Sequence, residues 1–142
     1  MGKIVLRRIT WLLLTCLMLS PSLLPAADAT ITVTKEQGGR EIALKVGDIL
    51  RIELPGKGGT GYSWFAEANG APYLKLMDQT TRQHKEGGVG GPVRVGGPVQ
   101  QVWRFKAAQP GATEIKLDYY RPWEGAGKAV DHVIFKLRIE KP

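Results

Sequence analysis

Two short segments of this chain carry residue types that are suited to holding a partner. Residues 60–64 read Thr-Gly-Tyr-Ser-Trp and residues 121–124 read Arg-Pro-Trp-Glu, so each sets aromatic rings beside turn-forming residues. Between them, residues 87–98 contain six glycines and two prolines. Tryptophan and arginine are enriched where binding energy is concentrated, and glycine lets the backbone approach another surface closely. The chemistry that these segments indicate is therefore recognition.

The titratable residues show no catalytic or metal-binding pattern. His84 lies in a polar stretch and His132 at the start of an expected strand, apart from each other and from any Ser–Asp arrangement of familiar spacing. No zinc-like or calcium-like ligand spacing occurs either. We expect two surface histidines, no catalytic residue, no metal and no cofactor, in a protein that is not an enzyme.

The first 29 residues have the form of a cleaved secretory signal peptide. A basic start precedes a largely apolar run at 9–19, and small residues follow up to Ala29, where cleavage is simplest. The run is shorter than the roughly 20 apolar residues of a membrane-spanning helix. We expect an exported protein, periplasmic or secreted, with a single domain over 30–142 and no integral membrane segment after cleavage.

Cys16 is the only cysteine, and it lies within the apolar run. Removal of the leader then leaves no thiol, which excludes nucleophilic cysteine chemistry, disulfides and cysteine-bound metal. A lipoprotein acylated at Cys16 is disfavoured, because Thr15 replaces the small residue usual before such a cysteine and the apolar stretch continues beyond it.

The charge of the chain does not favour nucleic-acid binding. The formal net charge is +7, and without the leader seventeen basic and twelve acidic side chains leave +5. These basic residues are scattered along the chain, whereas a nucleic-acid surface needs a basic stripe interleaved with stacking aromatics. We expect no nucleic-acid partner.

Short strands separated by turn residues follow the leader, and no window beyond it has a helical period. This spacing is typical of an all-β sandwich or barrel. Apolar and polar residues alternate, so that Trp103 and Phe105 share one apolar face and Ile115 and Leu117 another. Trp64 is expected in the core between the sheets. We expect strands at 30–35, 41–46, 49–54, 63–67, 74–79, 100–107, 113–120 and 131–140.

Both aromatic segments admit a second interpretation. The glycine-rich connection at 55–62 resembles a phosphate-binding loop, but such a loop needs a Lys-Ser or Lys-Thr pair that opens a helix, and Tyr62 opens a strand here. At the other segment, Trp123 could cap the core, with the stem of Arg121 covering it. The small residues 125–127 that follow favour an exposed tryptophan instead.

Taken together, the segments resemble the chagasin-like inhibitors of papain-type cysteine proteases, whose three loops carry Asn-Pro-Thr-Thr-Gly, Gly-x-x-Gly and Arg-Pro-Trp. The third pattern is complete at 121–123. In the first pattern Thr60 and Gly61 match, but residues 57–59 are Lys-Gly-Gly. The second fits 96–99, which reads Gly-Gly-Pro-Val and so lacks the closing glycine.

The resemblance covers about residues 31–139 and implies an immunoglobulin-like antiparallel β-sandwich of seven to eight strands. It implies that the first loop enters the active-site cleft of a papain-family cysteine protease and that the other two grip its walls, which blocks the enzyme reversibly and without a covalent bond. A near-copy of the middle segment at 90–92 leaves open which copy forms that loop tip. The residues implied to bind the protease are Gly59, Thr60, Gly61, Tyr62, Gly96, Gly97, Pro98, Val99, Arg121, Pro122 and Trp123.

Two other classes of function also fit an exported sandwich with aromatic loops. One is a binding or adhesion module that recognises a glycan, an envelope component or another protein, and the other is a structural subunit of an envelope assembly. A stable complex with a cysteine protease would separate the inhibitor from both. The Lys-Gly-Gly departure predicts a less rigid first loop, with weakened inhibition or altered target choice, in a protein expected to be monomeric.

Overall fold

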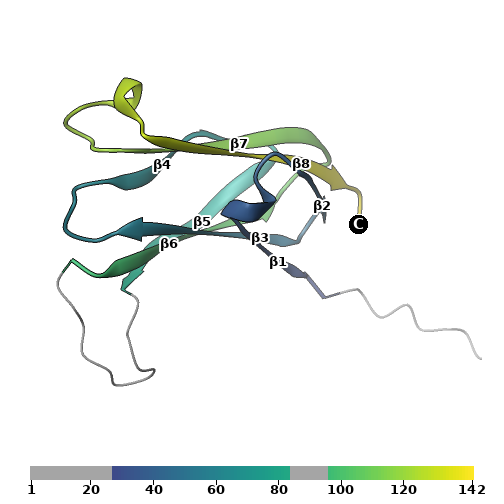
Figure 1. Ribbon diagram of the computed structural model, residues 1–142. Helices are drawn as coiled ribbons and strands as arrows, with labels where there is room; N and C mark the ends of the chain where they lie inside the picture. Colours follow the sequence, from purple (N-terminus) through teal and green to yellow (C-terminus); the bar gives the residue numbers. More distant parts are fainter. Residues whose placement is uncertain (1–26, 84–95) are drawn as a thin grey trace, which may run out of the picture.

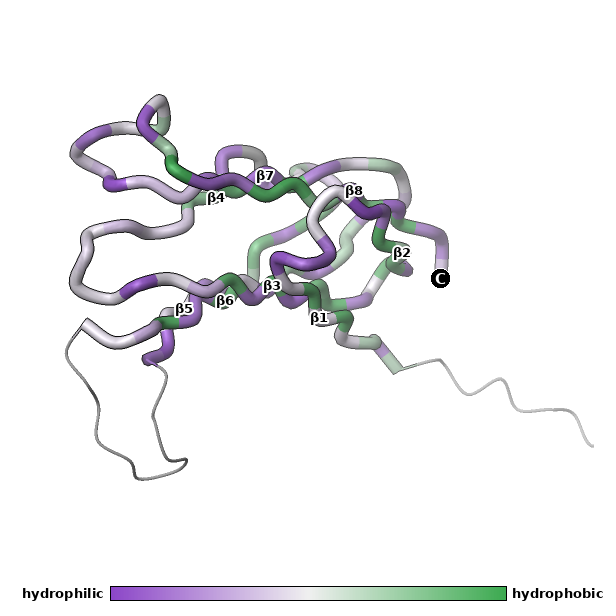
Figure 2. Tube along the Cα trace, in the orientation of Figure 1, coloured by the Kyte–Doolittle hydropathy of each residue, from purple (hydrophilic) through white to green (hydrophobic). Residues whose placement is uncertain are grey.

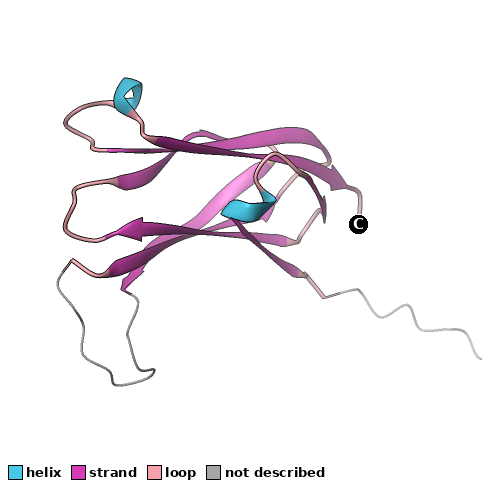
Figure 3. Cartoon of the chain, viewed as in Figure 1, coloured by secondary structure: helices cyan, strands magenta, loops and turns pink. Residues whose placement is uncertain are grey.

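The computed structural model describes residues 27–83 and 96–142. These residues form two stacked four-stranded sheets, which Figure 1 shows as an upper and a lower layer. Within the described ranges, two short 3-10 helices are the only helical elements (Figure 3). The elements are β1 (Thr30–Thr34), η1 (Lys35–Gln37), β2 (Glu41–Lys45), β3 (Ile49–Lys57), β4 (Ser63–Asn69), β5 (Leu74–Gln83), β6 (Pro98–Ala107), β7 (Gly111–Tyr120), η2 (Ala126–Lys128) and β8 (Asp131–Glu140).

The lower sheet has the strand order β1-β3-β6-β5 and the upper sheet β2-β8-β7-β4. Most neighbouring strands are antiparallel, but the edge strands β1 and β2 run parallel to β3 and β8. The helix η1 carries the chain from the edge of one sheet to the edge of the other, so β1 and β2 pair with different sheets. The expected immunoglobulin-like sandwich is confirmed, with parallel pairing added at these two edges.

The apolar face of each strand meets the other sheet and forms the core. Trp103 and Phe105 on β6 are each 1% exposed, and Ile115 and Leu117 on β7 are fully buried, as their alternation predicts. Trp64 lies between the sheets as expected, also at 1% exposure. Figure 2 shows hydrophobic and hydrophilic residues alternating along the strands, whereas the connection between β3 and β4 lies near the middle of the hydropathy scale.

Two strands extend further toward one end of the sandwich than expected. β3 continues past Leu54 to Lys57, and β5 continues past Gln79 to Gln83, because both pair with the first residues of β6. Proline usually interrupts a strand because it has no N–H to donate. Pro55 is accommodated because β1 pairs with β3 only as far as Glu53. On the β1 side of β3, Pro55 therefore has no neighbouring strand that needs its N–H. The longer strands support the loops that follow them.

A buried glutamine links the two sheets near this end. Gln101 on β6 is 5% exposed, and its side-chain oxygen accepts the backbone N–H of Trp64 at 2.7 Å. Its side-chain nitrogen donates to the Trp64 carbonyl at 3.4 Å. Because Trp64 belongs to the edge strand β4, these two bonds satisfy backbone groups that have no neighbouring strand on that side.

We expect Gln101→Leu to lower the free energy of unfolding by about 1 to 2 kcal/mol, because it leaves the buried Trp64 N–H without an acceptor. Urea denaturation followed by tryptophan fluorescence measures this change. Gln79→Leu is the matched control, since Gln79 is exposed on β5 and the same substitution there strands no buried group. Equal stability of the Gln101 and Gln79 variants would contradict the role given to Gln101.

Candidate functional site

Two loops and the residues that lead into β6 lie together at one end of the sandwich, away from the C-terminus (Figure 1). The first loop, 58–62, joins β3 to β4; the third, 121–130, joins β7 to β8; and residues 96–97 lead into β6. Because β3, β6, β4 and β7 all have one end at this edge, the sheet pairing alone brings the three segments together. We call this surface the loop end.

The first and third loops contact each other through Arg121. Its Nε donates to the carbonyl oxygen of Thr60 at 3.0 Å. Its guanidinium carbon lies 4.5 Å from the centre of the Tyr62 ring and 5.9 Å from that of Trp123. A cation over an aromatic face is attracted by the ring electrons. Arg121, which belongs to the third loop, therefore holds the first loop in place through Thr60 and Tyr62.

Trp123 stands on the backbone of the first loop. It is 70% exposed, so it does not cap the core, and the exposed alternative for this side chain is confirmed. A Cβ at Gly61 would stand 3.0 Å from Cζ2 and Cζ3 of Trp123 and closer still to Cη2. Gly61 also has φ +79°, which favours glycine. The glycine thus provides both the turn and the space that Trp123 occupies.

The first loop also contacts the middle segment. Gly58 N–H donates to the Gly97 carbonyl at 3.0 Å. Gly59 lies beside Gly96, since a Cβ on Gly59 would be 3.2 Å from the Gly96 Cα. The glycine copy at 96–98 therefore forms part of the loop end, while the copy at 90–92 lies outside the described residues.

Internal bonds hold the first loop even though it has Lys-Gly-Gly at 57–59. The Thr60 hydroxyl donates to the Lys57 carbonyl at 2.8 Å and accepts the Tyr62 N–H at 3.4 Å. Together with the bonds from Arg121 and to Gly97, these contacts support the loop from inside and from both neighbouring loops. Interactions across the loops thus support a segment whose own glycines leave it locally flexible.

A column of aromatic rings joins the loop end to the core. Tyr119 on β7 stacks on Tyr62 with ring centres 5.4 Å apart, and its ring is tilted against that of Trp64 at 4.9 Å. Its hydroxyl accepts the Lys57 N–H at 3.0 Å. Tyr119 is not among the residues predicted for the site; its place at the end of an alternating apolar face is the only signal in the sequence. Stacking between these two half-buried rings helps to fix the position of Tyr62.

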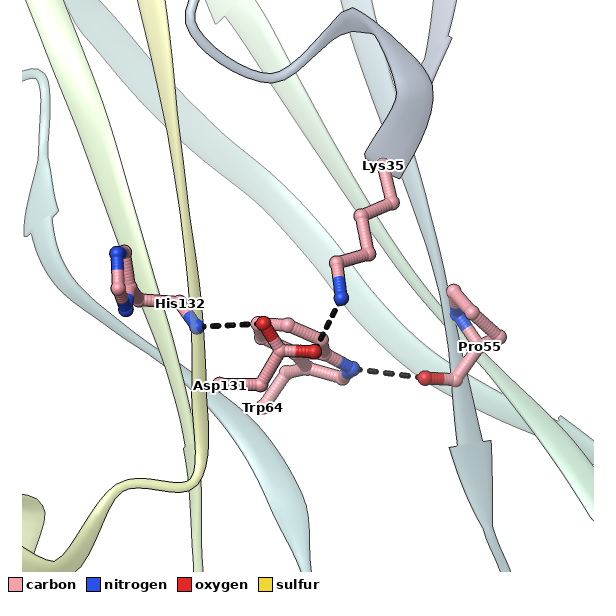
Figure 4. Close-up of polar contacts among 5 residues, drawn as sticks. All are labelled: Lys35, Pro55, Trp64, Asp131 and His132. Carbon is pink, nitrogen blue, oxygen red and sulfur yellow. Dashed lines mark hydrogen bonds and ion pairs between the residues drawn. The ribbon is translucent and has the colours of Figure 1, made fainter.

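An ion pair joins the first residue of β8, just after the third loop, to the helix η1, as Figure 4 shows. Lys35 in η1 pairs with Asp131, the first residue of β8, and its Nζ lies 5.8 Å from the centre of the Trp64 ring. The indole N–H of Trp64 donates to the Pro55 carbonyl at 2.8 Å. His132 uses its backbone N–H, at 2.9 Å, to bond Asp131, while its exposed ring points away from the cluster.

The surface histidine expected at 132 is confirmed, and His84 lies outside the described residues. Across 27–83 and 96–142, no three His, Cys, Asp or Glu side chains are grouped as metal ligands. None of the helices in the same ranges has the length and apolar character needed to cross a membrane. The loop end presents backbone groups, aromatic rings and an arginine held in place by its contacts. These groups suit the binding of another protein or ligand.

A β-sandwich whose first loop is contacted by the third loop and by residues 96–97 defines a class of loop-based binding domains. Within that class, the model of the family described as chagasin family peptidase inhibitor I42 matches residues 43–139. The chain therefore belongs to the chagasin family of peptidase inhibitors and is not an enzyme. Its relatives include Amoebiasin-2 of Entamoeba histolytica, which is 28% identical over 108 residues, 75% of this chain and 83% of that protein.

Two solved structures share the fold. The crystal structure of the cysteine protease inhibitor EhICP2 from Entamoeba histolytica has a TM-score of 0.68 at 24% identity, covering 79% of this chain and 96% of that one. The solution structure of Amebosin has a TM-score of 0.62 at 20% identity, covering 79% of this chain and 98% of that one. The sandwich is thus shared at low sequence identity.

The structure brings every residue predicted for the site to the loop end. The first loop is contacted by the third through Arg121 and Trp123 and by the middle segment through Gly96 and Gly97. Pro98 and Val99 are the first residues of β6, next to that middle segment. Contact of these residues with a protease stays a prediction.

Proposed function

We propose that this protein inhibits papain-family cysteine proteases reversibly, by placing its first loop in the active-site cleft with the other two loops against the cleft walls. Membership of a peptidase inhibitor family supports the class of function. The protease type rests on the resemblance of the loop motifs and on a structural neighbour described as a cysteine protease inhibitor. In this proposal the inhibitor excludes substrate from the cleft and forms no covalent bond with the protease.

One observation carries this proposal: Thr60 and Trp123 belong to the same surface, joined by Arg121. If the two loops lay at opposite ends of the sandwich, they could not occupy one cleft together. Loops held in place before binding lose little conformational freedom on docking, which favours tight association. The contacts with Arg121 and Trp123 give the first loop this support from outside its own sequence.

The proposal is tested by titrating residues 30–142 against papain and a cathepsin L-type protease. We expect dose-dependent inhibition, recovery of enzyme activity on dilution, a one-to-one complex in size exclusion and unchanged masses of both proteins afterwards. No inhibition of several such proteases at micromolar concentration would sink the proposal. A complex with a glycan or envelope component alone would favour the adhesion module.

We expect Arg121→Lys to raise the inhibition constant roughly tenfold, about 1.4 kcal/mol. Lysine keeps the charge but cannot both bond the Thr60 carbonyl and lie flat on the Tyr62 ring. Faster amide hydrogen exchange at 58–62 in the free variant would show that the first loop itself has loosened. Arg138→Lys, at an exposed pair with Glu41 on β2, is the control. Unchanged inhibition by the Arg121 variant would show that the contacts of Arg121 with the first loop are not needed for inhibition.

We also propose that residues 1–29 are removed on export to a periplasm or the outside of the cell. The basic start, the apolar run and the small residues before Thr30 support this. Mass spectrometry of the protein recovered from the exported fraction should give a chain that begins at Thr30. A full-length chain retained in the cytoplasm would contradict it.

A further inference from the structure

A hollow of about 650 Å³ lies beside the first and third loops. Its apolar lining comes from Pro55, Pro98, Tyr62, Tyr119 and Val130. None of the three loop motifs includes Val130, Pro55 or Tyr119, so the hollow is a feature that the motifs do not describe.

Val130 is the clearest sign that this hollow is unfilled in the free protein. It is 62% exposed and lies between η2 and β8. Its position is fixed, because its backbone N–H donates to the Tyr119 carbonyl at 2.9 Å. Exposed apolar surface next to a concave lining commonly marks a contact site.

The polar groups of the hollow limit what can occupy it. The Tyr119 hydroxyl accepts the Lys57 N–H, so its own proton remains available to donate. Lys57 and Arg121 also line the hollow and bring positive charge. An occupant that satisfies both features has an apolar body with a carboxylate or other acceptor beside it.

The hollow is continuous with the loop end, because Thr60 and Arg121 belong to both. A protease that takes the first loop into its cleft therefore brings one cleft wall against the hollow. We propose that the hollow receives an apolar side chain flanked by a carboxylate from the cleft wall of the bound protease, and that this contact helps to select the target. The inference rests on the function proposed above and adds a specificity contact to it.

Val130→Asp and Val130→Lys, compared by their inhibition constants, test this contact. Both remove the apolar lip, but the aspartate also opposes the expected carboxylate. We expect Val130→Asp to raise the inhibition constant about tenfold against a protease with an acidic cleft wall, and Val130→Lys to raise it less. Met77→Asp is the control, because Met77 is 47% exposed on β5, a strand that contributes nothing to the hollow.

The outcomes separate this inference from the proposed function. Loss of inhibition by Val130→Asp but not by Met77→Asp supports the contact. If the wild type inhibits and Trp123→Ala weakens it while both Val130 variants match the wild type, the hollow has no role although the inhibitor function stands. Equal losses for the two Val130 variants overturn the carboxylate partner. Inhibition by none of the proteins overturns both proposals.

A small molecule is the competing occupant. Phenylacetate, an apolar carboxylate, serves as the probe in an NMR titration of the free protein that follows the Val130 methyl groups. Saturable shifts at these methyls, with protease inhibition unaffected by the probe, would assign the hollow to a small ligand and overturn the protease contact. Saturable shifts that accompany a competitive loss of inhibition support the protease contact.

Discussion

Trp123→Ala is expected to weaken protease inhibition by at least about 2 kcal/mol, roughly thirtyfold in the inhibition constant, and to leave the fold intact. The side chain is 70% exposed, so its removal opens no cavity in the core. The Trp123 ring packs on Gly61 and lies near Arg121, so its position is fixed before a partner binds. Inhibition constants measured for papain, with thermal melting as the fold check, decide the matter.

Two variants make the result for Trp123 specific. Trp123→Phe keeps a flat apolar ring and should recover part of the lost affinity. Leu76→Ala truncates another exposed apolar side chain, 46% exposed on β5, and should inhibit like the wild type. A Trp123→Ala protein that is unfolded would show that the tryptophan supports the core, and one that inhibits normally would show that it is no anchor.

Gly61→Ala is expected to cost a comparable amount of binding free energy, again about 2 kcal/mol or more. The added Cβ overlaps the Trp123 ring, which must leave its place on the first loop. The backbone at φ +79° adds about 1 kcal/mol against a residue with a side chain. Both effects disturb the loop that we propose to enter the cleft. Surface plasmon resonance with an inactivated protease measures the loss.

Gly39→Ala is a matched control for Gly61→Ala. Gly39 has the same φ of +79°, but nothing lies within 4 Å of a Cβ placed there. Gly39→Ala therefore measures the free-energy cost of a side chain at this φ value without any overlap with a neighbouring ring. In the Trp123→Ala background, Gly61→Ala should cost much less than in the wild type, because the ring it displaces is gone. Fully additive losses would mean that Gly61 acts independently of Trp123.

Much of the architecture could be predicted from local patterns. Alternation placed Trp103, Phe105 and Ile115 in the core, and β8 runs over the expected residues, Asp131–Glu140. Strand ends near the loops were predicted too short, because the pairing of β3 and β5 with β6 extends them. The parallel edge strands β1 and β2 were not foreseen, since alternation within a strand carries no information about its neighbours.

The candidate site divides in the same way. Motif reasoning named the three loops, placed Trp64 inside and favoured an exposed Trp123. It did not find Gln101, Tyr119 or the pairing of Lys35 with Asp131, each of which joins segments far apart in the chain. Their residue types are ordinary, and only the pairing of the sheets shows what they reach.

By itself, then, the sequence determined which residues form strands and which form turns, because strand alternation and glycine turns depend on residues close together in the chain. The tertiary structure decided that Arg121 bonds Thr60, a residue 61 positions earlier, and that Trp123 rests on Gly61. Such contacts depend on the register of β4 against β7, where Ser63 pairs with Tyr120. That register brings the two loops together because each begins or ends beside this pair.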